Sequence, residues 1–129
     1  MDILVNLYYY RTIKSDFYLY NDSFVYVANY LIKENSSIII VSKEYSDSYE
    51  TINSMATKAV EQMQQWKNIS KAGYQKIIKD NQGVYFIRHR GMFGIYGLMC
   101  KNDDLNSGCD GVYIKSKALC EGWHYFLQE

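Results

Sequence analysis

The sequence predicts an α+β fold in which an antiparallel β-sheet packs against one long α-helix, within a single domain of residues 1–129. A regular apolar stripe predicts the helix at about residues 48–68. Short runs of β-branched and aromatic residues, separated by polar turns, predict strands on both sides of it. The 129 residues include no proline, and we find no internal repeat or linker. A chain of this length usually forms one domain with its own core.

Three strands are expected within the first 43 residues. The run DILVNLYYY at 2–10 is rich in branched and aromatic residues, as strands are. A β-hairpin is expected next, with strands near 24–32 and 38–43 joined by the polar turn KENSS. A helix is the close alternative for the first of these, because five apolar residues recur at helical spacing: Phe24, Val27, Ala28, Leu31 and Ile32.

The helix at 48–68 has the clearest start signal in the chain. Asp47 can cap its N-terminus, and Glu50, three residues later, completes a capping box. The segment 68–73 is expected to end it. The stripe that we expect to face the core consists of Tyr49, Ile52, Ala56, Ala59, Val60, Met63 and Trp66.

Residues 74–100 predict an antiparallel meander. In the turn DNQG, Gly83 stands where a positive φ is often needed. The run RHRGMFGIYG at 88–97 has a glycine at every third position, which raises the alternative of a phosphate-binding loop. Such a loop leads into the N-terminus of a helix, whereas IYGLM predicts a strand, so we expect a hairpin. A polar loop at 101–111, a strand at 112–115 and a short C-terminal helix or irregular tail follow.

The net charge is zero, but the charges are unevenly distributed. The span from Lys58 to Lys101 holds eight basic and two acidic residues, and the rest of the chain carries the compensating negative charge. Such a distribution can steer an oppositely charged partner, unless the two parts cancel in the fold.

Candidate partner-binding residues lie in this basic span. Alternation along a strand predicts Arg88 and Arg90 on one sheet face and His89 on the other. Arginines there can bind carboxylate or phosphate groups, although solvated strand-end arginines are the simpler alternative. The chain has 14 tyrosines, a residue type enriched at interfaces. The candidates are Arg88, Arg90, His89, Lys67, Lys71, Tyr85 and Tyr96.

The cysteines do not match a metal site well. Cys100, Cys109, Cys120 and His124 have the order of a CCCH zinc finger, but the middle gap is too long and contains an expected strand. The loop DDLNSGCDG alternates oxygen ligands as a calcium loop does, yet Lys115 stands where an EF-hand has its glutamate. We expect reduced thiols, no metal and no cofactor.

No catalytic motif is present. Neither the serine-hydrolase elbow nor the zinc-peptidase helix motif occurs in the sequence. A cysteine and a histidine could form a nucleophile pair, either His89 with Cys100 or His124 with Cys120. His124 next to Trp123 is more simply a packing residue, so we expect no catalytic residue and no enzymatic activity.

The segment SIIIVSKEYSDSYETINSMATKAVEQMQQW at 37–66 resembles the strand, polar turn and long helix of DcrB-like domains. The similarity of pattern continues through GYQKII, RHRGMFG and the tryptophan-bearing tail, over about 25–127. That family has the Mog1/PsbP-like α+β sandwich and includes adaptors of type VI secretion effectors. The resemblance implies protein binding without catalysis, and it transfers no functional residue.

The sequence therefore predicts a non-enzymatic protein-binding module for a partner with an acidic surface. The tyrosine-rich, proline-free composition is typical of AT-rich bacteria, phages or mobile elements, where such a module can be an immunity protein, an inhibitor or an adaptor. A nucleic-acid or nucleotide binder using the basic face of 58–101 is the alternative. No signal peptide or membrane span is recognised, so we expect a cytoplasmic protein without a membrane partner.

Overall fold

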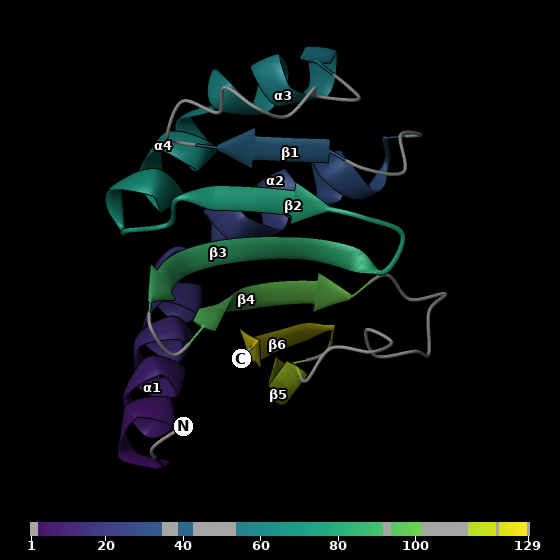
Figure 1. The fold of residues 1–129 in the computed structure, drawn as a ribbon. Coiled ribbons are helices and arrows are strands. Elements are labelled where there is room, and N and C mark those ends of the chain that lie inside the picture. Colours follow the sequence, from purple (N-terminus) through teal and green to yellow (C-terminus); the bar gives the residue numbers. More distant parts are fainter. Residues whose placement is uncertain are drawn as a thin grey trace.

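The computed structural model describes residues 3–34, 39–42, 54–91, 94–101, 114–120 and 122–128. The described strands form one antiparallel sheet in the order β1-β2-β3-β4-β6-β5. Helices α1 and α2 lie across one face of this sheet, and α3 and α4 lie at its β1 end (Figure 1). In chain order the elements are α1 (Ile3–Leu19), α2 (Asn21–Ile32), β1 (Ile39–Ser42), α3 (Ser54–Glu61), α4 (Gln64–Lys71), β2 (Lys76–Lys79), β3 (Gly83–Gly91), β4 (Gly94–Lys101), β5 (Ile114–Cys120) and β6 (Trp123–Gln128). The predicted α+β class is confirmed.

The strands expected at 2–10 and 24–32 are wrong, because residues 3–32 form the two helices α1 and α2. The strand expected at 38–43 is confirmed as β1. The helical alternative for 24–32 is the correct one. The fully buried residues of this segment recur at three and four positions and pack in a single core. Burial of one helical face therefore outweighs the strand preference of the tyrosines and branched residues. The buried set is Ile13, Phe17, Phe24, Val27, Ala28 and Leu31.

The single long helix at 48–68 is also wrong, because α3 and α4 are separate helices on either side of an extended Met63. At about 100° per residue, one continuous helix would place Trp66 about 120° around the axis from Val60. Because the helix is interrupted at Met63, Val60 and Trp66 both face the same hydrophobic core. The expected capping residues Asp47 and Glu50 lie outside the described residues.

The meander at 74–100 is confirmed as β2, β3 and β4, and RHRGMFGIYG does form a hairpin between β3 and β4. The expected positive φ at Gly83 is wrong. A Cβ at Gly83 would overlap the carbonyl oxygen of Cys100, so glycine is needed there for the close approach of two strands. Gly97 has the same role, because a Cβ there would overlap the carbonyl oxygen of Phe86. The positive φ of this hairpin is at Gly94.

The C-terminal helix or irregular tail is wrong, because β5 and β6 form a β-hairpin. The strand expected at 112–115 is confirmed for Ile114 and Lys115, which begin β5, and β5 continues to Cys120. Residues 112–113 lie outside the described residues. Gly122, at φ +81°, lies between the two strands. β6 inserts between β4 and β5, so the last strand of the chain is an inner strand of the sheet.

The two faces of the sheet differ in what they pack against. The helix-facing side contributes Phe86, Leu98 and Trp123 to the main core, together with residues from all four described helices. Side chains of the opposite face form a smaller cluster of Tyr85, Ile87, Met99 and Phe126.

Candidate protein-binding surface

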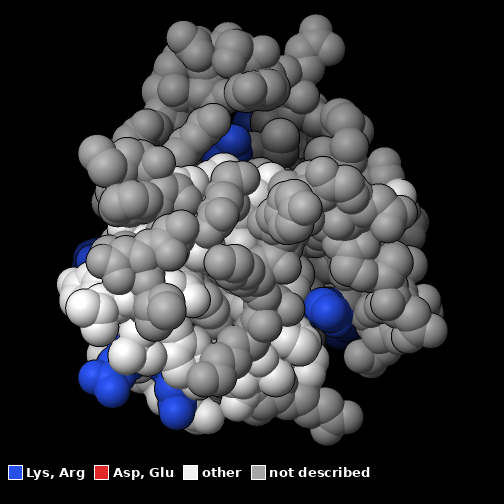
Figure 2. All heavy atoms as spheres, turned by 60° about the horizontal axis from the view of Figure 1, so that its bottom comes forward, with Lys and Arg blue, Asp and Glu red and all other residues white. Residues whose placement is uncertain are grey.

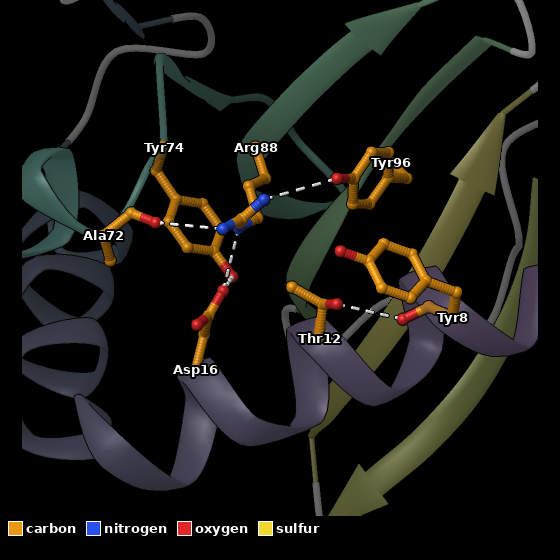
Figure 3. Close-up of polar contacts among 7 residues, drawn as sticks. All are labelled: Tyr8, Thr12, Asp16, Ala72, Tyr74, Arg88 and Tyr96. Atoms are coloured by element: carbon orange, nitrogen blue, oxygen red, sulfur yellow. Dashed lines mark hydrogen bonds and ion pairs between the residues drawn. The ribbon is translucent and has the colours of Figure 1, made fainter. Parts of the chain in front are cut away.

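Arg88 occupies a β-bulge and faces the helices, on the same side of β3 as Val84 and Phe86. The β3–β4 ladder pairs Ile87 with Gly97 and His89 with Tyr96, which leaves Arg88 as the extra residue between them. Its guanidinium lies between α1, the end of α4 and β4 (Figure 3). The Arg88 cation is therefore surrounded by hydrogen-bond acceptors from three elements.

Three contacts hold the Arg88 guanidinium. The Nε group donates to Oδ2 of Asp16 at 3.0 Å, and one terminal nitrogen donates to the carbonyl oxygen of Ala72 at 3.2 Å. The other terminal nitrogen lies 3.4 Å from the Tyr96 hydroxyl. The Tyr74 hydroxyl donates to the same Asp16 oxygen at 3.0 Å. The Arg88 side chain is 28% exposed and that of Asp16 14%, so the pair is largely screened from water.

Tyrosine rings on the inner side of α1 pack against the sheet. The Tyr9 ring stacks on Tyr96 with centroids 3.9 Å apart and planes 6° apart. The Tyr10 ring meets Tyr125 edge-on at 5.6 Å, and the Tyr125 hydroxyl donates to Oδ1 of Asn6 at 2.7 Å. Together with the Asp16–Arg88 pair, these contacts hold α1 in one orientation over β4 and β6.

Burial controls the electrostatics of this network. It raises the pKa of the Asp16 carboxyl, while the Tyr74 hydrogen bond and the charge of Arg88 act in the opposite direction. It also raises the pKa of the Tyr74 phenol, and the neighbouring Asp16 charge raises it further. Burial alone would lower the pKa of Arg88, but the Tyr96 hydrogen bond and the Asp16 charge leave it raised. The arrangement holds an ion pair and neutral phenols, which is a structural role.

The predicted site residues do not form one patch. Arg88 and Tyr96 come together on the helix side of the sheet, whereas Tyr85 belongs to the cluster on the opposite face. Lys67 and Lys71 are exposed on α4.

The last two predicted residues lie beyond the bulge. His89 and Arg90 belong to β3, and their side chains lie outside the described part of the structure. The bulge changes the alternation of faces at Arg88, so the expectation that Arg88 and Arg90 share a face loses its basis.

The cysteines in the described strands are not placed to pair. Cys100 is buried on β4 and is not part of a disulfide. Cys100 and Cys120 both align with Trp123, from opposite sides of β6. Their Cα atoms are therefore two strand spacings apart, about 9–10 Å, which is too far for a disulfide bond. Within the described ranges, no group of three or more His, Cys, Asp or Glu could hold a metal ion.

The outer face of α1 is an exposed surface with large apolar side chains. We define it by eight residues that recur at three and four positions along the helix: Leu4, Leu7, Tyr8, Arg11, Lys14, Ser15, Tyr18 and Leu19. Leu4 is 72% exposed, Tyr8 66% and Leu19 71%. The exposed apolar side chains form two groups, with Leu4, Leu7 and Tyr8 near the start of α1 and Tyr18 and Leu19 at its end. Arg11, Lys14 and Ser15 lie between them.

The charged residues of this face are basic. Arg11 and Lys14 are exposed. The acidic residue among the described residues of α1 is Asp16, and it is bound to Arg88. Figure 2 turns the bottom of Figure 1 forward, where α1, β5 and β6 lie. The charged side chains of described residues visible on that face are Lys or Arg.

A hollow of about 350 Å³ lies where α1 ends. Tyr18 and Leu19 of the outer face line it together with Asp22 from α2 and Asn68 from α4. The outer face of α1 therefore borders an open hollow whose charged lining residue is the exposed Asp22.

The outer face of α1 was not among the candidates, because residues 2–10 were expected to form a strand. The outer face of α1 could have been predicted from the helical spacing of Ile13 and Phe17. These two residues assign one side of the helix to the core, so the other side must face outward. That signal is weak in α1, since apolar residues surround the helix instead of forming a single stripe.

Comparison of the chain with models of protein families, with curated proteins and with solved structures finds no match. None of the helices in the described ranges is both long and apolar enough to cross a membrane.

Proposed function

We propose that this chain is a non-enzymatic protein-binding module that acts in the cytoplasm and uses the outer face of α1 as its contact surface. Immunity proteins, inhibitors, and adaptors of toxin, secretion or phage counter-defence systems are modules of this kind. The resemblance of 37–66 to DcrB-like domains is consistent with the adaptor role. The supporting observation is the row of exposed leucines and tyrosines on a helix whose inner side is anchored to the sheet.

Two physical reasons favour binding by this face. Large apolar and aromatic side chains provide most of the energy at interfaces, and tyrosine is enriched among the residues that matter most. The Asp16–Arg88 pair and the Tyr9–Tyr96 stack hold α1 in place before any partner arrives. A contact surface that is already ordered loses less conformational entropy on binding.

The test uses the full chain immobilised as bait for a lysate of its host cell. Any captured protein is then purified, and its affinity is measured with the wild type and with Tyr8→Ser/Tyr18→Ser. Both tyrosines are mainly exposed, and the Tyr18 hydroxyl donates a long hydrogen bond of 3.5 Å to the Leu119 carbonyl oxygen. The double variant should therefore stay folded, with a small loss of stability, and lose at least tenfold in affinity. An interaction that Tyr8→Ser/Tyr18→Ser leaves unchanged would place the contact surface elsewhere.

Nucleic-acid or nucleotide binding by the basic span of 58–101 is the second candidate. Lys58, Lys67 and Lys71 are exposed on α3 and α4, which favours it. Two other bases of the span are engaged within the fold, since Arg88 binds Asp16 and Lys79 donates to the carbonyl oxygen of Glu34. Affinity for an RNA or DNA oligonucleotide that falls steeply with salt, and falls further in Lys67→Glu/Lys71→Glu, would favour this candidate.

A further inference from the structure

The outer face of α1 has a charge pattern that restricts what can bind to it. Arg11 and Lys14 lie in the middle of the face. Leu4 and Tyr8 lie on one side of them, and Tyr18 lies on the other. At 1.5 Å per residue, the two apolar ends are about 15–20 Å apart along the axis. The face is therefore apolar at both ends and positively charged in its centre.

A second copy of this chain fits this pattern poorly. A twofold interface brings the same patch of both molecules together. The midpoint between the two apolar ends falls close to Arg11, so antiparallel pairing of two α1 helices places the two copies of Arg11 against each other. Parallel pairing does the same, because each residue then faces its own copy. Like charges placed directly opposite at an interface disfavour association.

We infer that the outer face of α1 docks an acidic amphipathic helix of another protein. In this helix, Asp or Glu side chains lie between two apolar groups spaced like those of α1. A helix is the expected form, because residues spaced three and four apart on α1 form ridges that pack into the grooves of another helix. The carboxylates would meet Arg11 and Lys14, and the apolar groups would cover Leu4, Tyr8 and Tyr18. This inference rests on the proposed function and names the chemistry of the partner.

The charge pairing predicts a large effect of charge reversal. Arg11 and Lys14 are flanked by apolar side chains, so a docked helix would exclude much of the water around them. Close charge pairs at such partly desolvated positions show strong coupling across an interface. Arg11→Glu/Lys14→Glu should weaken binding of an acidic helix by about 30-fold or more. Lys67→Glu/Lys71→Glu on α4 is the matched control, because it changes the net charge equally at another exposed site.

The probe is a display library of helical peptides with randomised outward positions, selected against the full chain. The wild type and Lys67→Glu/Lys71→Glu should both enrich peptides with Asp or Glu between apolar residues. Arg11→Glu/Lys14→Glu should instead enrich peptides with Lys or Arg at those positions. The most enriched peptide of each selection is then synthesised, and its affinity is measured for all three chains by fluorescence anisotropy.

Three outcomes overturn the inference in different ways. If the wild type and Arg11→Glu/Lys14→Glu enrich the same peptides, the charge complementarity is wrong and the protein-binding function stands. If no enriched peptide loses affinity for Tyr8→Ser/Tyr18→Ser, the α1 surface itself is wrong, and the proposed function loses its site. If sedimentation shows a dimer at micromolar concentration that Leu4→Ser/Tyr18→Ser dissociates, the occupant is a second copy of this chain.

Discussion

Asp16 and Arg88 lie 72 residues apart in the sequence, and their side chains meet at 3.0 Å between α1 and β3. This ion pair links the N-terminal helix to the sheet, as does the hydrogen bond from the Tyr125 hydroxyl to Asn6. Because it is largely screened from water, removal of either partner leaves a charge that lacks its counter-ion.

We expect Asp16→Ala and Arg88→Ala each to lower the free energy of unfolding by about 2 kcal/mol. The double variant should lose much less than the sum of the two, because the second change removes a charge that is already unpaired. Urea unfolding of the four proteins measures this coupling. Arg11→Ala is the control, since Arg11 is exposed and its removal should change stability by less than about 0.5 kcal/mol. Additive losses would show that the pair is not coupled.

The acid range should reveal the burial of Asp16. Burial raises its pKa in the folded chain above the ordinary 3.8. The folded state therefore holds this proton more tightly than the unfolded state, and the contribution of Asp16 to stability falls as the pH rises through this window. The stability of the wild type relative to Asp16→Asn should thus decrease from pH 3.8 upward and become constant at higher pH. A relative stability that increases with pH would contradict this expectation.

The same carboxyl gives a second, spectroscopic prediction. The charge and hydrogen bond of Arg88 lower the Asp16 pKa against the effect of burial. In Arg88→Ala we therefore expect the Asp16 pKa to be higher than in the wild type. An NMR titration of the labelled carboxyl carbon measures it in both proteins. An equal or lower value in Arg88→Ala would mean that the ion pair does not form in solution.

Alkaline pH should unfold the protein cooperatively. Burial raises the pKa of the phenols of Tyr74, Tyr96 and Tyr125 above the ordinary 10. The unfolded chain loses these protons first, so stability falls as the pH rises above 10, by up to about 1.4 kcal/mol per pH unit for each phenol. Urea unfolding between pH 9 and 11 tests the slope, which should be shallower in Tyr125→Phe. A slope that is unchanged in Tyr125→Phe would argue that this phenol is accessible to water.

Two glycines should respond differently to alanine. A Cβ at Gly97 would overlap the Phe86 carbonyl oxygen, which is backbone and can move only with the strand. We expect Gly97→Ala to destabilise the fold by about 3 kcal/mol or more. Gly122 has open space around it and a φ of +81°, so Gly122→Ala should cost only about 1–2 kcal/mol of backbone strain. Equal losses in thermal or urea unfolding would refute the close approach at Gly97.

The meander could be predicted from the sequence because its signals are local. Asp80 accepts hydrogen bonds from the backbone of Gln82 and Gly83, which is the turn that the residues DNQG favour. The continuous apolar run at 84–87 of β3 is also typical of a strand that is buried on both faces. Both signals depend on neighbours in the chain and need no knowledge of the tertiary packing.

The N-terminal helices and the role of Arg88 could not be predicted in the same way. Tyr8, Tyr9 and Tyr10 favour a strand by composition, and only their packing against the sheet makes a helix the better solution. The sequence does not predict α1, so it offers no hydrogen-bond acceptor for the Arg88 guanidinium. A basic residue without an acceptor is expected to lie on the surface. The acceptor is Asp16, and its contact with Arg88 can be inferred only when α1 is known to pack against the sheet.

The position of β6 has a consequence for the order of folding. Among the described strands, β6 pairs with the edge of β4 that lies opposite β3 and also with the inner edge of β5, and β6 is the most C-terminal of these strands. While the ribosome is still adding residues before Trp123, both edges lack the strand that pairs them in the final structure. Closure of the sheet therefore has to wait until the chain is synthesised beyond Gln128, and a nascent chain stalled earlier would present two open strand edges to chaperones or to neighbouring chains.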